Sequence, residues 1–256
     1  MAEPLLRIEG LIKRFGGIVA TDNLSLDIAS GELHAIIGPN GAGKTTLISQ
    51  LIGQLRPSAG AIHFAGGDIT HLPAWRRSHL GLARSFQITS LLPDFTAADN
   101  VALAAQARDG HSFRFFGAAR KEKSLRDAAH AALERVGLGA RADVVVASLS
   151  HGEQRELELA VALATKPQLL LLDEPMAGLG ATESARMVKL LADLRKEVTI
   201  VLVEHDMNAV FALADRITVL VYGRVIASGA PDAIRANEEV KRAYLGDQHV
   251  VTSHGG

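Results

Sequence analysis

The stretch GPNGAGKTT, residues 38–46, constrains the fold of this chain more than any other feature of its sequence. It matches the pattern G-x-x-x-x-G-K-[ST] and lies between an apolar strand pattern, HAII, and a helical pattern, LISQLI. Glycine residues allow successive backbone N–H groups to converge on phosphate oxygens at the start of a helix. The stretch therefore predicts a strand, a phosphate-binding loop and a helix in that order, and with them a nucleoside triphosphate site.

Two side chains follow the last glycine of this loop. The Lys44 ammonium is expected beside the β- and γ-phosphates, and the Thr45 hydroxyl is suited to ligate Mg²⁺. We expect the nucleotide to be bound by Gly38, Asn40, Gly41, Gly43, Lys44, Thr45 and Thr46. A nucleotide and Mg²⁺ are the ligands that the loop predicts.

The stretch LLLLDEP, residues 169–175, supplies a second half of such a site. Its four leucines predict a buried strand, and Asp173 follows at the carboxyl end, where open α/β sheets bind ligands. The Asp173 carboxylate is suited to hold Mg²⁺, and Glu174 is suited to orient or deprotonate an attacking water. Together with the phosphate loop, this pattern predicts hydrolysis.

Three further residues are each open to two interpretations. His205 closes the apolar stretch VLVEH; a histidine there is more often structural, but a strand beside that of Asp173 would bring it to the γ-phosphate. Gln87 is by composition a polar loop residue between a strand and a helical segment. Phe15 can stack on a base, although a core or surface role is usual for a lone aromatic residue.

Composition excludes several classes of function. The net charge of −1 gives no field that would attract nucleic acid or anionic lipid. The absence of cysteine excludes disulfides, thiol catalysis and cysteine-ligated metal, and it fits a reducing compartment. The N-terminal residues lack a secretory signal pattern, and no stretch approaches the ~20 apolar residues of a membrane span. We expect a soluble chain that reaches a membrane only through a partner.

The pattern of apolar residues changes twice along the chain. Strand patterns fill the sequence to about residue 62, helical patterns rich in alanine and leucine fill 97–165, and strands alternate with helices from 168 onward. In the last part we expect helices over 181–196 and near 207–214. Short apolar strands alternating with helices predict a parallel sheet covered on both faces. The segment 108–126, aromatic and then basic, is either a solvated helical hairpin tip or a docking surface.

The stretch SLSHGEQRE, residues 148–156, carries the Ser-x-x-Glu pattern of a capping box, formed here by Ser150 and Glu153. It predicts the start of a helix. Because helix N-termini also bind anions, the same residues are compatible with a phosphate site.

These motifs, in this order, resemble the nucleotide-binding subunits of ABC transporters, with residues 38–46 similar to Walker A, 169–174 to Walker B, and LSHGEQ to the family signature. The resemblance implies an α/β P-loop NTPase fold with a RecA-like core, an N-terminal antiparallel β subdomain and an inserted helical subdomain. It places one ABC ATPase domain over 1–256. The α/β core with the β subdomain occupies 1–96 and 166–256, and the helical signature subdomain occupies 97–165.

The resemblance also implies roles that the residues alone leave open. Gln87 becomes the Q-loop residue, acting in catalysis and as a metal ligand, His205 the switch histidine, and Phe15 the adenine-stacking aromatic. It implies a head-to-tail dimer that buries two ATP molecules, in which Ser150 and Gly152, with Glu153 beside them, act on the nucleotide of the partner subunit.

Finer features, including KRFGGIVATDNLSLDI, GLARSFQ and the closing AYLG, resemble the branched-chain amino-acid uptake ATPases of the LivG type. This implies a second ABC ATPase subunit, identical or different, two membrane permeases and, indirectly, a periplasmic binding protein. The location implied is cytoplasmic, on the inner face of the cell membrane. Related importers carry urea, amides and aromatic acids, so the solute stays open.

Two other assignments remain as alternatives: a lipopolysaccharide-export ATPase and a soluble ATPase of iron–sulfur assembly. DNA-repair relatives need a long coiled coil between the two halves of the site, and this chain has no sustained heptads there, so we expect no nucleic-acid partner.

The sequence departs from the family pattern at three positions. His151 and Glu153 stand where Gly and Gln are commonest, and Gly180 stands where most relatives have an aspartate. Glu153 adds negative charge near a phosphate site while completing the capping box. Gly180 removes a side chain that would help to couple the two nucleotide sites, so we expect altered coupling with hydrolysis retained.

Overall fold

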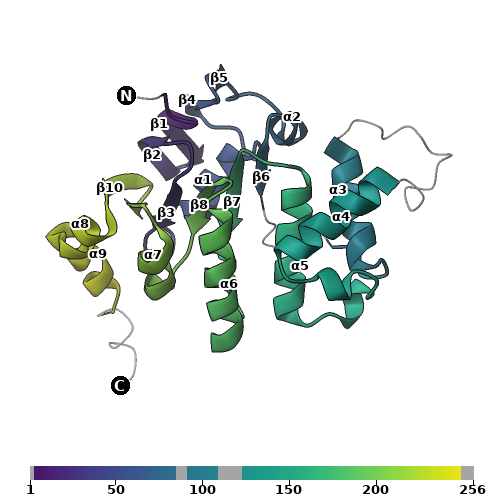
Figure 1. Ribbon diagram of the computed structural model, residues 1–256. Coiled ribbons are helices and arrows are strands. Elements are labelled where there is room, and N and C mark those ends of the chain that lie inside the picture. Colours follow the sequence, from purple (N-terminus) through teal and green to yellow (C-terminus); the bar gives the residue numbers. More distant parts are fainter. Residues whose placement is uncertain (1–2, 85–90, 109–122, 249–256) are drawn as a thin grey trace. The chain divides into compact units, whose positions relative to one another are not determined.

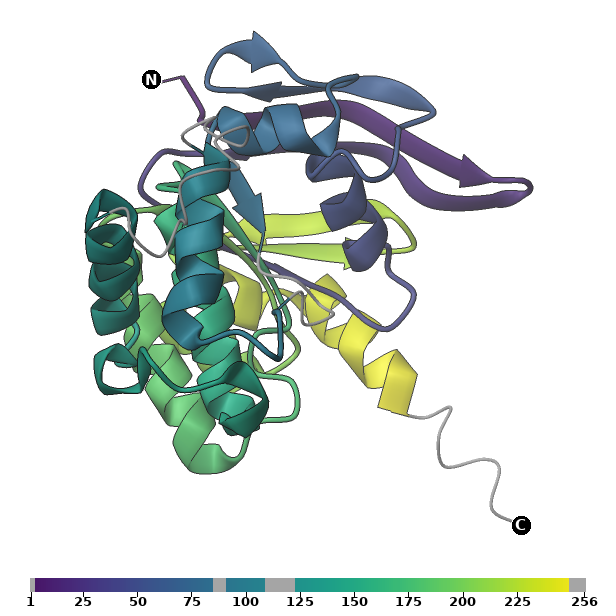
Figure 2. The ribbon, with the colours of Figure 1, turned by 90° about the vertical axis from the view of Figure 1, so that its right-hand side faces the viewer.

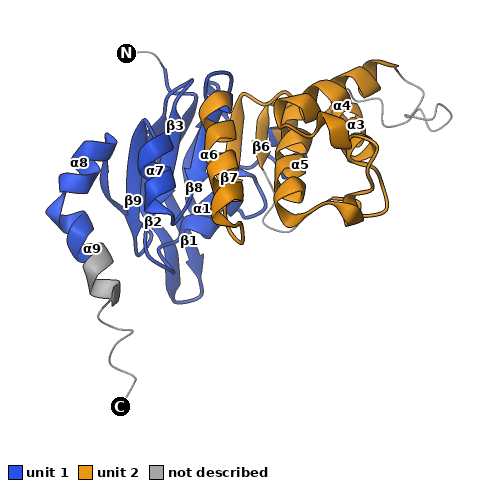
Figure 3. Cartoon of the chain, turned by 60° about the horizontal axis from the view of Figure 1, so that its bottom comes forward, with its two compact units in different colours: residues 1–77, 194–256 blue, residues 78–193 orange. Residues whose placement is uncertain are grey.

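The computed structural model describes residues 3–84, 91–108 and 123–248. Figure 1 labels the helices and strands, and Figure 3 colours the two compact units into which the chain divides. Unit 1 comprises residues 1–77 and 194–256, and unit 2 comprises residues 78–193.

Unit 1 contains an antiparallel sheet. Its strands, in order across the sheet, are β2 (Ile18–Ile28), β1 (Leu6–Phe15), β4 (Ala59–Phe64) and β5 (Gly67–Asp68). The long β1–β2 hairpin, purple in Figure 2, pairs from Leu6 with Ile28 to Phe15 with Ile18. Its alternating apolar residues are buried on one face, as the period of a half-exposed strand requires.

Unit 1 also contains four strands of a mostly parallel sheet. In order they are β10 (Arg224–Gly229), β9 (Arg216–Val221), β3 (Leu33–Ile37) and β8 (Thr199–Val203). Strands β9, β3 and β8 run parallel, and β10 pairs antiparallel with β9. Every residue of β3 and β8 is buried, which explains why all of them except His34 are apolar or β-branched.

The helices of unit 1 are short. They are α1 (Lys44–Leu51), α7 (Met207–Leu213), α8 (Pro231–Ala236) and α9 (Glu238–Gln248), while α2 (Ala74–His79) crosses the boundary between the units. The helix predicted after the phosphate loop and the helix predicted near 207–214 are both confirmed.

Unit 2 combines a pair of parallel strands with four longer helices. The strands are β6 (Leu82–Arg84) and β7 (Leu169–Asp173), and the helices are α3 (Ala97–Arg108), α4 (Lys123–Arg135), α5 (His151–Ala164) and α6 (Ala181–Leu194). Helices α3, α4 and α5 pack on one another through buried leucine and alanine side chains. The helix predicted over 181–196 ends two residues earlier, at Leu194.

Two features of the sequence fall wholly or mostly outside the described residues: Gln87, and the segment 108–126 apart from its two ends. Over the described ranges, no helix is long and apolar enough to cross a membrane.

Candidate nucleotide-binding site

The phosphate loop of unit 1 joins the buried strand β3 to helix α1. Gly43 is the N-cap residue of α1, with φ of 100°, in the left-handed region that favours glycine. A Cβ atom at this position would overlap the carbonyl oxygen of Ala20 on β2, and one at Gly38 would overlap the carbonyl oxygen of Leu220 on β9. Glycine is required at both positions because neighbouring strands touch the loop there.

The N-terminal end of helix α1 presents backbone groups and has no capping side chain. Its first turn contains no acidic residue. The first N–H groups of a helix have no partner within the helix, and the helix dipole adds positive potential at the same place. This end of α1 is therefore built to accept an anion.

The side chains of the loop complete this cationic surface. Lys44 Nζ donates hydrogen bonds to the carbonyl oxygens of Gly38 and Pro39, at 2.6 and 3.1 Å, so its ammonium lies against the loop. Asn40 and Thr45 are exposed, and Thr46 is half-buried. The residues predicted to bind the triphosphate thus lie together on one loop and the first turn of one helix.

A turn far along the sequence supports the loop. Tyr222 and Gly223, with φ of 47° and 77°, join β9 to β10 in a two-residue hairpin of the kind that needs two positive φ values. The Gly223 N–H donates to Ala42 of the loop, and the Gly223 carbonyl accepts from the N–H of Asp22 on β2, both at 2.9 Å. The loop is thereby tied to β2 and to the β9–β10 turn.

His205 follows the carboxyl end of β8 in unit 1. Its side chain is 69% exposed, whereas the preceding Glu204 is buried. The Glu204 carboxylate accepts a hydrogen bond from the His205 backbone N–H at 2.9 Å, and Asp206 caps the next helix, α7, by accepting from Asn208 and Ala209. The two carboxylates fix the backbone around His205 and leave its imidazole accessible. The sequence reasoning did not single out Glu204, although it precedes the histidine directly.

Phe15 lies at the end of β1, next to the tip of the hairpin. Its side chain is 48% exposed, and Lys13 Nζ stands 5.2 Å from the centre of the ring. A half-exposed ring at a hairpin tip is available for stacking, as predicted for a base-binding aromatic residue.

Asp173 is the last residue of β7 in unit 2, and only 3% of it is exposed. Arg84, at the end of the neighbouring strand β6, pairs with Asp173 Oδ2 at 2.9 Å. A buried carboxylate needs such a partner, because an unpaired charge is costly away from water. Arg84 was missed from the sequence: it lies 89 residues from Asp173, and only the pairing of β6 with β7 brings them together.

Glu174 holds a strained backbone directly after Asp173. Its φ of 51° places a non-glycine residue in the left-handed region, where the chain begins to turn. The Glu174 carbonyl then accepts from the Ala177 N–H at 3.1 Å. Strained conformations of this kind concentrate at functional sites, which supports the sequence-based prediction that Glu174 is a functional residue.

The signature stretch in unit 2 forms the predicted capping box. Ser150 is the N-cap of α5 and accepts from the Glu153 N–H at 3.2 Å, while Glu153 accepts from the Ser150 N–H at 2.8 Å. Arg141 adds an ion pair to Glu153 at 2.9 Å. The hydrogen bond from the Ser150 backbone, and then Arg141, lower the pKa of Glu153. The negative charge at this departure from the family pattern is therefore paired within the chain.

The predicted residues fall into two sets. Unit 1 holds Phe15, the loop 38–46 and His205, and unit 2 holds Asp173, Glu174 and the signature residues Ser150, Gly152 and Glu153. The first set supplies an anion-binding loop, a lysine and an aromatic ring. The second supplies two adjacent carboxylates and a capped helix start.

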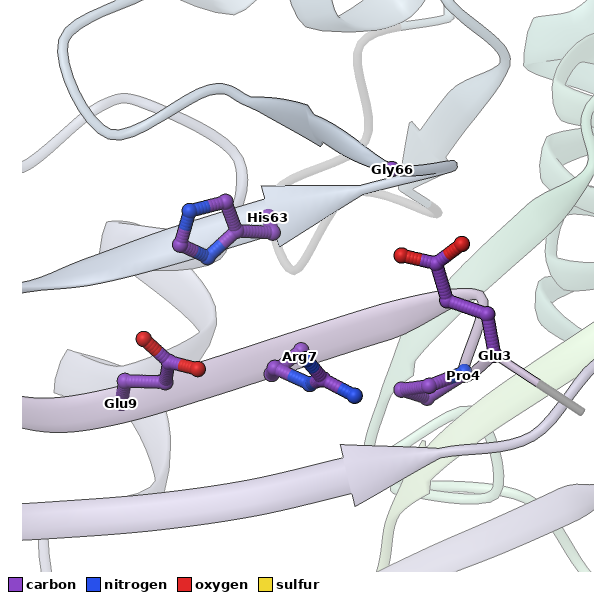
Figure 4. A pocket seen from close by; sticks show the side chains of 6 residues that line it. All are labelled: Glu3, Pro4, Arg7, Glu9, His63 and Gly66. Atoms are coloured by element: carbon purple, nitrogen blue, oxygen red, sulfur yellow. The ribbon is translucent and has the colours of Figure 1, made fainter. Parts of the chain in front are cut away.

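A small pocket of about 150 Å³ lies elsewhere in unit 1, on the antiparallel sheet (Figure 4). It is lined by Glu3, Pro4, Arg7, Glu9, His63 and Gly66. None of these is a predicted site residue, and the described part of the chain contains no cluster of three or more His, Asp or Glu side chains arranged to hold a metal. The pocket is therefore separate from the phosphate loop.

The chain belongs to the ABC transporter family, whose model matches residues 21–177, from the strand beside the phosphate loop to the residues after Glu174. It is an ATP-binding and ATP-hydrolysing subunit of that class. A second model, described as a branched-chain amino acid ATP-binding cassette transporter, matches residues 224–250.

Several curated proteins are similar along almost their whole length. The high-affinity branched-chain amino acid transport ATP-binding protein LivG of Salmonella typhimurium is 39% identical over 96% of this chain and 100% of its own. The corresponding protein BraF of Pseudomonas aeruginosa is 38% identical over the same shares. A probable LivG protein of Archaeoglobus fulgidus is 34% identical over 95% of this chain and 96% of its own.

Solved structures confirm the predicted fold class. An ATP-binding cassette of an ABC transporter in its ADP conformation has a TM-score of 0.86 at 29% identity, covering 96% of this chain and 100% of that one. A dimeric cassette bound to ADP and Pi, in a post-hydrolysis state, has a TM-score of 0.75 at 26% identity, covering 88% and 98%. The fold is thus the ABC-type P-loop fold with its antiparallel β subdomain.

Proposed function

We propose that this chain is the ATP-hydrolysing subunit of an importer for branched-chain amino acids or related small hydrophobic solutes. The observation that carries the proposal is the 39% identity to LivG over 96% of this chain and 100% of that protein. The second family match, over residues 224–250, supports it from the C-terminal end.

The proposal includes partners and a location. The chain pairs with a second ABC ATPase subunit, identical or different, and the pair docks on two membrane permeases that receive solute from a periplasmic binding protein. The chain lies in the cytoplasm, on the inner face of the cell membrane. The dimeric cassette among its structural relatives supports the pairing.

The residues of unit 1 bind the nucleotide in this proposal. The uncapped start of α1 and the N–H groups of the loop hold the phosphates, and Lys44 places its charge against the β- and γ-phosphates. Phe15 stacks on the adenine. His205, with its exposed imidazole, contacts the γ-phosphate.

Glu174 orients the attacking water and accepts its proton, and Gln87, assigned by the family resemblance, also takes part in catalysis. The donor set fits Mg²⁺, because the Thr45 hydroxyl and the Asp173 carboxylate are the hard oxygen ligands that this ion prefers. Thr45, Asp173 and Gln87 would hold the ion, which when bound neutralises charge on the phosphate oxygens.

Ser150, Gly152 and Glu153 act on the nucleotide of the partner subunit in the proposed head-to-tail dimer. Within this arrangement the helical subdomain comprises residues 97–165 and the α/β core with the β subdomain comprises 1–96 and 166–256. The capping box supports a well-ordered start of α5, as a helix that presents N–H groups to a phosphate requires.

The test is purification of the chain from membranes, identification of its partners by mass spectrometry, and uptake by the reconstituted complex. We expect two permeases, a second ATPase subunit and ATP-dependent uptake of radiolabelled leucine. A lipopolysaccharide-export permease, or an iron–sulfur assembly scaffold, in place of these partners would overturn the proposal.

A further inference from the structure

The start of α5 lies against the segment that follows β7, and both belong to unit 2. The His151 ring lies against Gly178, where an added Cβ atom would stand 3.2 Å from His151 Cε1. The Glu183 carboxylate lies against Gly152, where an added Cβ atom would stand only 2.5 Å from Glu183 Oε1. The glycine of the signature therefore makes room for a side chain of the same molecule.

Glu183 is held in this place by a second contact. Its Oε2 atom accepts a hydrogen bond from the Gly180 N–H at 3.0 Å. Gly180 precedes α6 and its carbonyl accepts the first helical bond, from Ser184, so it is the N-cap residue. Glu183 thus provides one half of a capping box, and Gly180 has no side chain to provide the other.

One turn further along α6, a second pair joins the same two helices. Arg186 bonds Glu156 of α5 at 2.8 Å, and Glu156 is 6% exposed. Burial raises the pKa of Glu156, and Arg186 opposes that effect. Residues 183 and 186 share one face of α6, and residues 152 and 156 share one face of α5, because positions three and four apart are neighbours on a helix. We call the His151–Gly178, Glu183–Gly152 and Arg186–Glu156 contacts together the α5–α6 contact.

We propose that Glu183 is a positioning residue that fixes the start of the signature helix to the loop carrying Glu174 and Gly180, so that the two segments move together. This inference rests on the proposed function, in which Ser150 serves the nucleotide of the partner and Glu174 serves that of its own chain. Glu183 then links the two nucleotide sites within one subunit. It takes over part of the coupling that the missing side chain at Gly180 would otherwise supply.

Hydrogen exchange of the full chain tests the link without any need for hydrolysis. Glu183→Ala removes the carboxylate and keeps a good helix former, whereas Glu183→Gln keeps an oxygen acceptor for Gly180 and a similar volume beside Gly152. We expect Glu183→Ala to speed exchange in two peptides, 176–184 and 148–156, and Glu183→Gln to exchange like the wild type.

The control is Glu238→Ala, which removes a carboxylate from the first turn of α9, where it pairs with Lys241 at 2.7 Å, far from α5 in the sequence. Faster exchange in 176–184 alone would mean that Glu183 only caps α6, and the proposal would be wrong. Faster exchange throughout the chain, including β3, would indicate general destabilisation and would also overturn the proposal.

ATP hydrolysis gives an independent measurement. We expect Glu183→Ala to lower kcat by about tenfold, to change KM for ATP by less than about threefold, and to reduce the Hill coefficient towards one. Wild-type kcat and Hill coefficient in Glu183→Ala would contradict the inference. Failure of the importer proposal would be recognised by a different result, the absence of leucine uptake by the wild-type complex.

Discussion

At the scale of single residues, Glu174 combines a strained backbone with the carboxylate that we propose activates the attacking water. A φ of 51° costs on the order of 1 kcal/mol for a residue with a Cβ atom, and glycine at this position would relieve it. Glycine would also remove the group proposed to activate water. The side chain is thus retained at some expense of stability, as is common where a local conformation serves chemistry.

The first prediction concerns this carboxylate. Glu174→Gln keeps the size of the side chain but is a very weak base, so it should bind ATP normally and hydrolyse it at least about 100-fold more slowly. Phosphate release and equilibrium ATP binding measure the two effects. Glu239→Gln, an exposed change in the first turn of α9, is the matched control. Wild-type turnover in Glu174→Gln would show that another group activates the water.

At the scale of elements, the two helix starts of the proposed site are built in opposite ways. The start of α1 has neither a capping side chain nor an acidic residue. The start of α5 has both, in Ser150 and Glu153, and Arg141 pairs with the glutamate. An anion that reaches α1 meets a helix start without a capping side chain, whereas at α5 it must compete with the capping box for the first N–H groups. Glu153 is therefore engaged in capping α5, whether or not an anion is bound.

The second prediction follows from the lowered pKa of Glu153. A carboxyl group with a depressed pKa in the folded state stabilises the fold above its unfolded value, 4.5, and this stabilisation is lost as the pH falls through the folded value. Glu153→Gln should therefore be about 0.5 kcal/mol less stable than the wild type near pH 7, with the difference shrinking below pH 4.5. Urea unfolding at several pH values measures it, and a difference independent of pH would contradict the assignment.

The other end of α1 depends on one buried arginine. Arg77 is 2% exposed and donates to the last carbonyls of α1, those of Gln50 and Leu51, at 2.8 and 2.7 Å. It also donates to Thr70 and Leu72, both at 3.0 Å. Burial lowers the pKa of Arg77 to about 10, so the guanidinium remains charged at neutral pH. Arg77 thus satisfies helix-end carbonyls that would otherwise be without partners.

The third prediction is that Arg77→Met lowers the free energy of unfolding by about 2–4 kcal/mol, because several buried carbonyls lose their donor. Arg77→Lys should not restore it, since an ammonium lacks the planar fork of donors. Arg76→Met is the control: Arg76 is exposed over the Trp75 ring, and its loss should change stability by less than about 0.5 kcal/mol. Thermal unfolding that ranks both methionine variants equally would refute this role.

At the scale of the whole molecule, the sequence predicted features formed by consecutive residues and missed contacts between segments that are distant in the sequence. The phosphate loop and the Ser150–Glu153 capping box lie within a few consecutive residues, and the fold class and capping box are confirmed. Arg84 beside Asp173, and Glu183 beside Gly152, depend on segments that only the folded chain brings together. Gln87 was identified by family resemblance alone, because a polar loop residue has no distinguishing pattern.

The fourth prediction concerns the proposed dimer. If each nucleotide site takes Glu174 from one chain and Ser150 from the other, a mixed dimer of Ser150→Arg and Glu174→Gln chains keeps one intact site. Each variant alone should be inactive in ATP hydrolysis, and mixing the two should restore activity. Mixing that restores nothing would show that each site is built from a single chain.

The β9–β10 turn has a consequence for how the protein is made. Gly223 bonds Ala42 and Asp22, so the shape of the phosphate loop depends on a residue about 180 positions closer to the C-terminus. During synthesis the complete motif leaves the ribosome long before this support exists. A nascent chain that ends before β9 would carry every residue of the phosphate loop and still lack the hydrogen bonds to Gly223 that support it, so tight ATP binding should arise only after β9 and β10 have been synthesised.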